Sequence, residues 1–413
     1  MKRITVVLIL ISLWCFSLNA ADFGIMLDQN ADFSAHEADV ENTRIDYSGV
    51  LIPRLTSLLG SYGELYISAG LNYNYSYNFN DDLNADEPEQ AFFVPELLRT
   101  EAALRFNNSE VRFGRMFYRE PLEFIASGLF DGAMYTHSTK GGNFSVGCWY
   151  TGLLYKNRTV IGMTGDERRT IDVELDYEDF AQTYFASRRL FSALGWEHPA
   201  LAGLVDIKTT ALFQFDLNET NLHSQYFIAK AAIPFSYFIF DLGGSIELIE
   251  NEDDFNTAFA GEAGLSFLPP SSAAARLTLR GRFTSGVSED GIVGAFLPLT
   301  TEPQGALLKT NISGLSVLSL DYLTRLHNNF SANINASYFI RSDLGTYKNY
   351  PVTGIESDGY FLGMEFYGRL FWNLSTGTRL NMGGGVFLPS FGDAVPDAEM
   401  LWRAELKLIL SIL

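Results

Sequence analysis

Residues 64–79 read ELYISAGLNYNYSYNF, and this stretch decides the fold class. Its odd positions, from Leu65 to Phe79, are apolar or aromatic, whereas its even positions are mostly small or polar, among them Ser68 and Asn72. Such alternation places the two sets on opposite faces of one β-strand. Strands of soluble proteins average about five or six residues, so a soluble sandwich or propeller is a poor fit. A strand this long with one apolar face is typical of a transmembrane β-barrel, whose closure satisfies every backbone polar group.

The same alternation recurs along the chain and gives the strand count. It is clear in residues 206–216, 238–248, 274–284, 330–341 and 402–412. Tight polar turns, such as 327–329, and longer acidic stretches, such as 81–89 and 166–179, join these segments. At roughly 22 residues for a strand and its share of connections, the chain holds about 16 to 18 strands. We predict an all-β, antiparallel transmembrane barrel of about eighteen strands, with sixteen as the alternative. The weakest strand candidates are 22–29 and 158–177.

The N-terminal segment, residues 1–20, reads as a signal peptide. Lys2 and Arg3 precede an apolar stretch at 4–16, and the small-residue exit at 17–20 ends in Ala20. Beyond Ala20 no apolar run reaches the roughly 18 residues that a membrane helix needs. We therefore expect one barrel domain over residues 21–413, exported to the outer membrane of a double-membraned bacterium.

The overall charge excludes several function classes. The chain has a formal net charge of −20, whereas binding to nucleic acid needs a basic surface, so we expect no nucleic-acid partner. Its five histidines form no His-Glu-x-x-His motif, and the sequence has no nucleophile elbow and no Gly-rich phosphate loop. We expect no enzymatic activity, no catalytic residue, no cofactor and no metal site.

Strand parity places several arginines on the faces opposite the apolar ones, and therefore in the lumen. The lumen candidates are Arg99, Arg105, Arg112, Arg276, Arg280 and Arg282. Guanidinium groups fixed along a water-filled path favour anions. In the alternative interpretation these arginines pair across the lumen with Glu101, Glu262, Glu365 and Glu405 and brace the wall. Arg276, Arg280 and Arg282 follow one another on a single strand and are too crowded to be neutralised locally, so they are the strongest candidates for selectivity.

A second feature lies after residues 110–115, where the alternation stops. Residues 118–128 contain apolar side chains that suit a loop folded inward rather than an exposed one. Gly114 would let the chain kink there and re-aim Arg115. We predict a constriction loop opposite Arg112, or, equally, an ordinary loop packed on the barrel rim. The constriction candidates are Arg119, Glu120, Glu123 and Asp131.

Two stretches of the chain resemble known outer-membrane barrels. Residues 111–115 (VRFGR), followed by a loop and residues 130–132 (FDG), resemble the strand-loop-strand of porin-like barrels. Residues 362–366 (LGMEF) with 379–389 (RLNMGGGVFLP) resemble the closing part of alginate-export-type barrels. The resemblance implies an eighteen-strand channel with an Arg-rich lumen for anionic solutes.

These observations together give an expected function and two alternatives. We expect passive diffusion of small hydrophilic, anionic solutes through the barrel. The expected partners are outer-membrane lipid, those solutes and the barrel-assembly machinery. The sequence leaves the oligomeric state open. One alternative is a plugged or closed barrel that serves as a surface adhesin or structural protein. The other is a transporter of apolar solutes, which would have an apolar lumen and an N-terminal plug. Residues 31–42 could enter the lumen but are polar.

Overall fold

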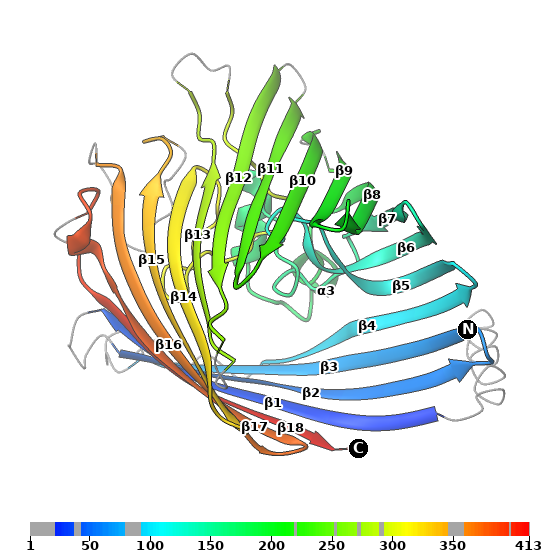
Figure 1. Cartoon of the computed structure of the whole chain (residues 1–413). Coiled ribbons are helices and arrows are strands. Elements are labelled where there is room, and N and C mark those ends of the chain that lie inside the picture. The colour runs from blue at the N-terminus through cyan, green and yellow to red at the C-terminus, as the bar shows by residue number, and fades with distance from the viewer. Residues whose placement is uncertain are drawn as a thin grey trace.

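The chain folds into a single closed β-barrel in the computed structural model (Figure 1). The structure describes residues 21–36, 43–78, 92–218, 221–251, 254–270, 274–288, 293–345, 359–395 and 398–412. Within these ranges, 18 antiparallel strands form one sheet, and β1 closes it by pairing with both β2 and β18. The predicted eighteen-strand antiparallel barrel is confirmed, and the sixteen-strand alternative is wrong. The predicted signal peptide lies outside the described residues.

The strands follow one another around the barrel in chain order, each beside its sequence neighbour. They are β1 (Ala21–His36), β2 (Thr43–Leu59), β3 (Gly63–Asn78), β4 (Phe92–Phe106), β5 (Ser109–Arg119), β6 (Ser127–Thr139), β7 (Gly142–Tyr150), β8 (Arg189–Leu201), β9 (Val205–Asp216), β10 (His223–Phe235), β11 (Phe238–Asn251), β12 (Asp254–Phe267), β13 (Arg276–Thr284), β14 (Leu315–His327), β15 (Phe330–Arg341), β16 (Phe361–Ser375), β17 (Thr378–Leu388) and β18 (Leu401–Ile412). A short 3-10 turn, η2 (Pro389–Phe391), follows β17.

The connections differ between the two ends of the barrel. One end has tight turns, such as 107–108 and 328–329, whereas the other has the long loops 151–188 and 285–314. The weak strand candidate 22–29 is part of β1. Residues 31–36, the described part of the segment 31–42, also belong to β1 and therefore lie in the wall rather than in the lumen. The candidate 158–177 is wrong, because it lies in the loop 151–188.

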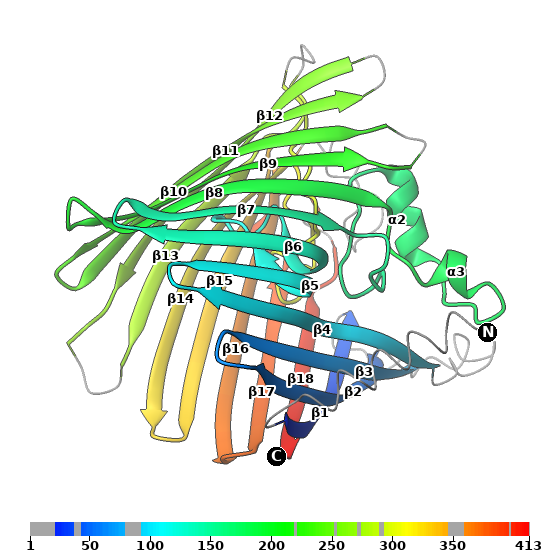
Figure 2. The ribbon, with the colours of Figure 1, turned by 90° about the vertical axis from the view of Figure 1, so that its right-hand side faces the viewer.

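That loop carries two short helices, α2 (Gly165–Asp172) and α3 (Phe180–Thr183), next to the ends of β7 and β8 (Figure 2). The physical reason is local. The Thr164 hydroxyl accepts a hydrogen bond from the Glu167 amide at 3.2 Å, and the Glu167 carboxylate accepts from the Thr164 amide at 3.0 Å, a capping box that starts a helix. No helix in the described ranges is long and apolar enough to cross a membrane.

The outer surface of the barrel is apolar. On β11, Phe240, Leu242 and Ile246 are exposed outward, whereas Ser245 and Glu247 are buried inside. Other strands repeat this split, with exposed Leu71, Tyr75, Phe93, Phe215, Phe227, Leu279, Ile334 and Leu406. A continuous apolar belt of this extent is what a membrane-spanning barrel presents to lipid.

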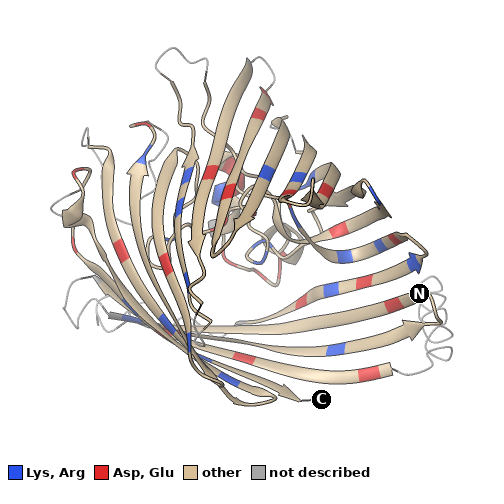
Figure 3. Ribbon diagram, in the orientation of Figure 1, with Lys and Arg blue, Asp and Glu red and all other residues tan. Residues whose placement is uncertain are grey.

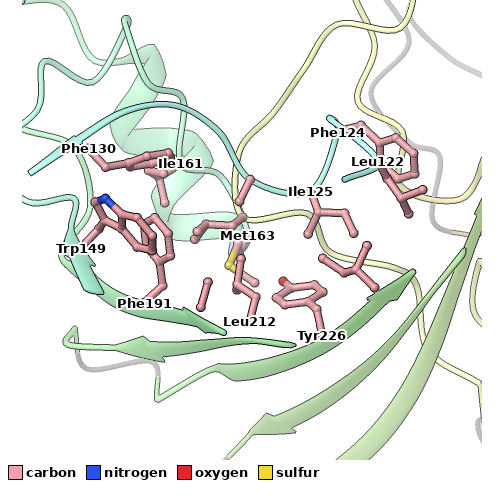
Figure 4. Close-up of a cluster of buried hydrophobic side chains, with 14 of the residues drawn as sticks. Leu122, Phe124, Ile125, Phe130, Trp149, Ile161, Met163, Phe191, Leu212 and Tyr226 are labelled. Carbon is pink, nitrogen blue, oxygen red and sulfur yellow. The ribbon is translucent and has the colours of Figure 1, made fainter. Parts of the chain in front are cut away.

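Inside the barrel, three loops pack against the wall formed by β5 to β12. They are 120–126, 151–188 and 293–314, which contribute Ile125, Met163 and Phe296 among others to one apolar cluster. Figure 4 shows loop side chains meeting wall side chains such as Phe191 and Tyr226. This part of the lumen is therefore filled by protein.

Gly114 kinks β5, as the sequence predicts. Its φ is +111°, a region that favours glycine, and the last β4–β5 pair joins Thr100 to Arg115. Beyond that pair β4 and β5 make no further backbone pairs, and the guanidinium of Arg115 on β5 connects to groups on β4 and β6. It binds both carboxylate oxygens of Asp131, at 2.9 and 2.8 Å, and donates to the Leu97 carbonyl on β4.

Replacing Gly114 with alanine tests this kink. The added Cβ would meet the Thr100 carbonyl oxygen, and the positive φ alone costs about 1–3 kcal/mol, so Gly114→Ala should lower the urea midpoint of the folded barrel. Gly281→Ala is the matched control, because nothing lies within 4 Å of its added Cβ, and it should change stability by less than about 0.5 kcal/mol. Equal midpoints for the two variants would contradict the kink.

Candidate functional site

The basic face of the lumen lies on β13. Figure 3 shows basic positions close together along this strand. Glu262 on β12 binds Arg282 through Nε at 2.7 Å and Lys230 through Nζ at 2.9 Å, and it lies 3.8 Å from Arg280 Nε. Arg276 makes no ion pair with any described residue. Several cations therefore share one carboxylate, and this wall keeps a positive charge.

The other predicted lumen arginines also face inward, but they are balanced. Glu101 binds Arg99, and it binds Arg112 at 2.7 Å. Arg105 lies next to the 107–108 turn and binds Glu110 at 2.9 Å and Glu64 at 3.3 Å. These three arginines therefore brace the wall, but through acids of the same strand or of an adjacent strand rather than across the lumen.

The loop 120–126 folds into the lumen. The buried Glu120 carboxylate accepts hydrogen bonds from the amides of Leu122 and Ile125, the latter at 2.9 Å, and so holds the loop in shape. Leu122 reaches Gly243 on β11, and the guanidinium of Arg282 lies 5.3 Å from the ring centroid of Phe124. The loop thus extends from β5 to the basic wall.

The predicted constriction residues take different positions within and beside this loop. Glu120 is buried, and Asp131 is bound to Arg115. Arg119 and Glu123 form an exposed ion pair at 3.3 Å. Arg112, the arginine expected opposite the loop, is bound to Glu101, whereas Arg282 of the β13 wall lies over the ring of Phe124 in the loop.

Burial changes the acidity of Glu120. Loss of water raises the pKa of this carboxyl to about 7, although the backbone amides of the loop and the positive charge of Lys230 act in the opposite direction. The packed loop therefore favours the neutral carboxyl.

A second inward loop crosses the lumen over its described residues 293–314, and the sequence alone did not predict this path. Phe296 and Leu299 pack in the cluster on the β5–β12 side, whereas Leu308 packs in a second cluster with Leu315 and Phe387 on the other side. The two inward loops are joined: the amide of Thr300 donates to the Ile125 carbonyl at 3.1 Å, and the Thr300 hydroxyl accepts from the amide of Ser127 at 3.0 Å. The crossing loop lacks alternation of apolar and polar residues, which indicates a loop in the sequence. Nothing in the sequence indicates that this loop crosses the lumen.

Glu365 on β16 holds the far end of this crossing loop. Its buried carboxylate accepts hydrogen bonds from the amides of Ala306, Leu307 and Leu308 at 2.8, 2.9 and 3.0 Å. Arg403 on β18 donates to the Ala306 carbonyl at 2.6 Å. The expected pairing of Glu365 with a lumen arginine is wrong, because backbone amides occupy this carboxylate.

Beside the loops, the described residues line two cavities in the lumen that bear on function. The smaller, about 610 Å³, contains the basic face: its charged lining is Arg276, Arg280, Arg282, Lys309, Arg369, Arg403, Asp321 and Glu365. The larger, about 1290 Å³, is lined by Asp28, Arg158, Glu174 and Lys407 among others, and Arg369 lines both. The crossing loop adds Lys309, whose side chain is exposed to this cavity. Partial loss of water around its ammonium group, and then the charge of Arg403, lower the pKa of this residue. No group of three or more potential metal ligands comes together in the described part of the chain.

The fold resembles those of solved outer-membrane channels from Pseudomonas aeruginosa. OccK2 (OpdF), solved in complex with glucuronate, shares 12% identity and a TM-score of 0.58, with 95% of this chain and 99% of that chain covered. OpdK, solved with vanillate, shares 9% identity and a TM-score of 0.60 over 95% and 98% of the two chains. OpdQ shares 9% identity and a TM-score of 0.60 over 95% and 97%.

At these identities the likeness establishes the fold, an eighteen-strand porin-like barrel. It is a likeness to Opd and Occ channels, so the expected closeness to alginate-export-type barrels is not supported. No family model matches the sequence, and no curated protein matches it significantly.

Removing the Glu365 charge tests whether this residue holds the crossing loop. Hydrogen bonds to charged groups contribute about 1.5–3 kcal/mol each, so Glu365→Gln should loosen the loop and give single channels with higher and noisier conductance. Glu64→Gln, which removes a carboxylate whose one ion pair with a described residue is to the exposed Arg105, should leave conductance unchanged. Wild-type conductance in Glu365→Gln would mean that other contacts fix the loop.

The Glu120 carboxyl predicts a pH dependence. When the loop opens, its pKa returns toward about 4.5, so the packed loop is most stable at acidic pH and loses stability as the pH rises from about 4.5 to about 7. Current fluctuations of single channels should become more frequent over this interval. Glu120→Gln should remove that pH dependence, and its persistence in the variant would assign the effect to another group.

Proposed function

We propose that this protein is an outer-membrane channel for the passive diffusion of small hydrophilic anions. The closed barrel has an apolar exterior and charged inner faces, and a barrel of this size encloses an aqueous lumen. The solved channels of the same fold with glucuronate and vanillate, both small organic acids, agree with this function.

The observation that carries the proposal is the excess of positive charge at the smaller cavity. Lys230, Arg280 and Arg282 share the carboxylate of Glu262, while Arg276 and Lys309 make no ion pair with a described residue. Fixed cations in a narrow aqueous path surrounded by low-dielectric protein raise the local concentration of anions and exclude cations.

A plugged barrel remains the second candidate, because the three inward loops fill the lumen beside β5 to β12. The two adjoining cavities favour the channel, since they leave polar space on the other side. The charged lining of the smaller cavity also disfavours transport of apolar solutes.

Replacing the three β13 arginines tests the source of selectivity. The variant Arg276→Gln, Arg280→Gln, Arg282→Gln should lose most of its preference for chloride over potassium, measured as the zero-current potential under a salt gradient. Its matched control is Arg99→Gln, Arg105→Gln, Arg112→Gln, which removes the same formal charge from wall that lines neither cavity. The control should shift the potential much less, and equal shifts would show that selectivity does not reside on β13.

A further inference from the structure

On the β14–β15 side, the described inner wall next to Arg280 is built from neutral polar groups and the carboxylate of Asp321. In the strand register, Arg280 pairs with Ser319, and Ser319 pairs with Ser337. In the adjacent inward row, Asp321 of β14 pairs with Asn335 of β15. Paired residues on one face have Cβ atoms about 4.5–5.5 Å apart, so these groups form one continuous surface, and all five line the smaller cavity.

Arg280 has hydrogen-bonding capacity to spare. Its side chain is 37% exposed and donates no hydrogen bond to a described residue, and the Glu262 carboxylate, 3.8 Å from its Nε, is already held by Arg282 and Lys230 at shorter distances. A guanidinium group with free donors fits a carboxylate well, because it can make two parallel hydrogen bonds.

Asp321 is the feature that a purely anion-attracting wall does not explain. Its carboxylate accepts a hydrogen bond from Asn333 at 2.7 Å, and it makes no ion pair in the described part of the barrel although it lies diagonally across from Arg280. A carboxylate here repels a simple anion. It becomes favourable only when the solute brings hydrogen-bond donors, since an ionised carboxylate is an acceptor alone.

Hydroxyl groups fit these acceptors better than an ammonium group does. The cavity is lined by six cationic side chains, which oppose a positively charged group on the solute. The same cavity is lined by Ser319, Asn335, Ser337 and Gln304, whose side chains can both donate and accept, as hydroxyl groups do.

We propose that the smaller cavity is a recognition site for small polyhydroxylated carboxylates of the sugar-acid class. Arg280 binds the carboxylate of the solute, and Asp321 with its neighbours on β14 and β15 accepts hydrogen bonds from the hydroxyl groups. The inference rests on the proposed anion channel and adds the substrate class and a specificity-determining residue, Asp321.

Gluconate and hexanoate are suitable probes, because both are six-carbon monocarboxylates and they differ in their hydroxyl groups. The measurement is the concentration of each acid that halves the chloride conductance of the channel. In the wild type, gluconate should act at a concentration about tenfold lower than hexanoate, as expected for hydrogen bonds to a charged group. Equal concentrations for the two acids would overturn the proposal.

The variant Asp321→Asn separates hydroxyl recognition from electrostatics. Removing a negative charge strengthens the attraction for every anion, so electrostatics alone predicts tighter binding of both acids. Hydroxyl recognition predicts opposite changes: gluconate weakens by about tenfold, while hexanoate is unchanged or tightens. Tighter binding of both acids would overturn the role of Asp321.

Glu174→Gln is the control, because it removes a carboxylate from the larger cavity instead. It should shift both acids alike, and a selective loss of gluconate in this variant would place the site in the wrong cavity. The zero-current potential in potassium chloride alone tests the anion channel itself. Anion preference without discrimination between the acids would reject only the sugar-acid site, whereas cation preference would reject the channel proposal as well.

Discussion

The interior of this barrel depends on buried wall carboxylates that accept hydrogen bonds from loop backbone. A loop that leaves water must find partners for its amide groups, because an unpaired buried amide is costly. Glu247 on β11 accepts from the Leu297 amide at 2.8 Å, and Glu365 on β16 accepts from three successive amides beginning at Ala306. The crossing loop is therefore fixed on two opposite parts of the wall, and the chain between these points spans the lumen.

This use of carboxylates explains how an acidic protein has a basic passage. The chain has 49 acidic and 29 basic residues, yet several acids that reach the lumen are already engaged. Glu365 binds backbone, Glu101 binds Arg99 and Arg112, and Asp32 binds Arg403 at 2.9 Å. Among the described acids, only Glu262 lies within 4 Å of the β13 cations. The positive charge of this part of the lumen therefore follows from where the acids are held rather than from their number.

The sequence predicts the wall much better than the interior, and the reason is the range of the interactions. Strand parity is a local property, so alternation in residues 64–79 was enough to predict β3, and parity also placed the β13 arginines inside. The apolar side chains of 120–126 likewise indicated an inward loop. The role of Glu365 was not predictable, because its partners are 57–59 residues away and are backbone amides, which leave no pattern in the sequence. The segment 158–177 was misassigned because its capping box is a short signal that competes with weak alternation.

We propose that uncompensated cations on β13, next to a loop fixed across the lumen, make this barrel an anion-preferring pore. The most direct measurement is the zero-current potential of the unmodified protein in a planar bilayer between unequal concentrations of potassium chloride. We expect stable conductance steps and a zero-current potential whose sign shows that chloride permeates more readily than potassium. A potential of the opposite sign, or a folded barrel without conductance, would contradict this account.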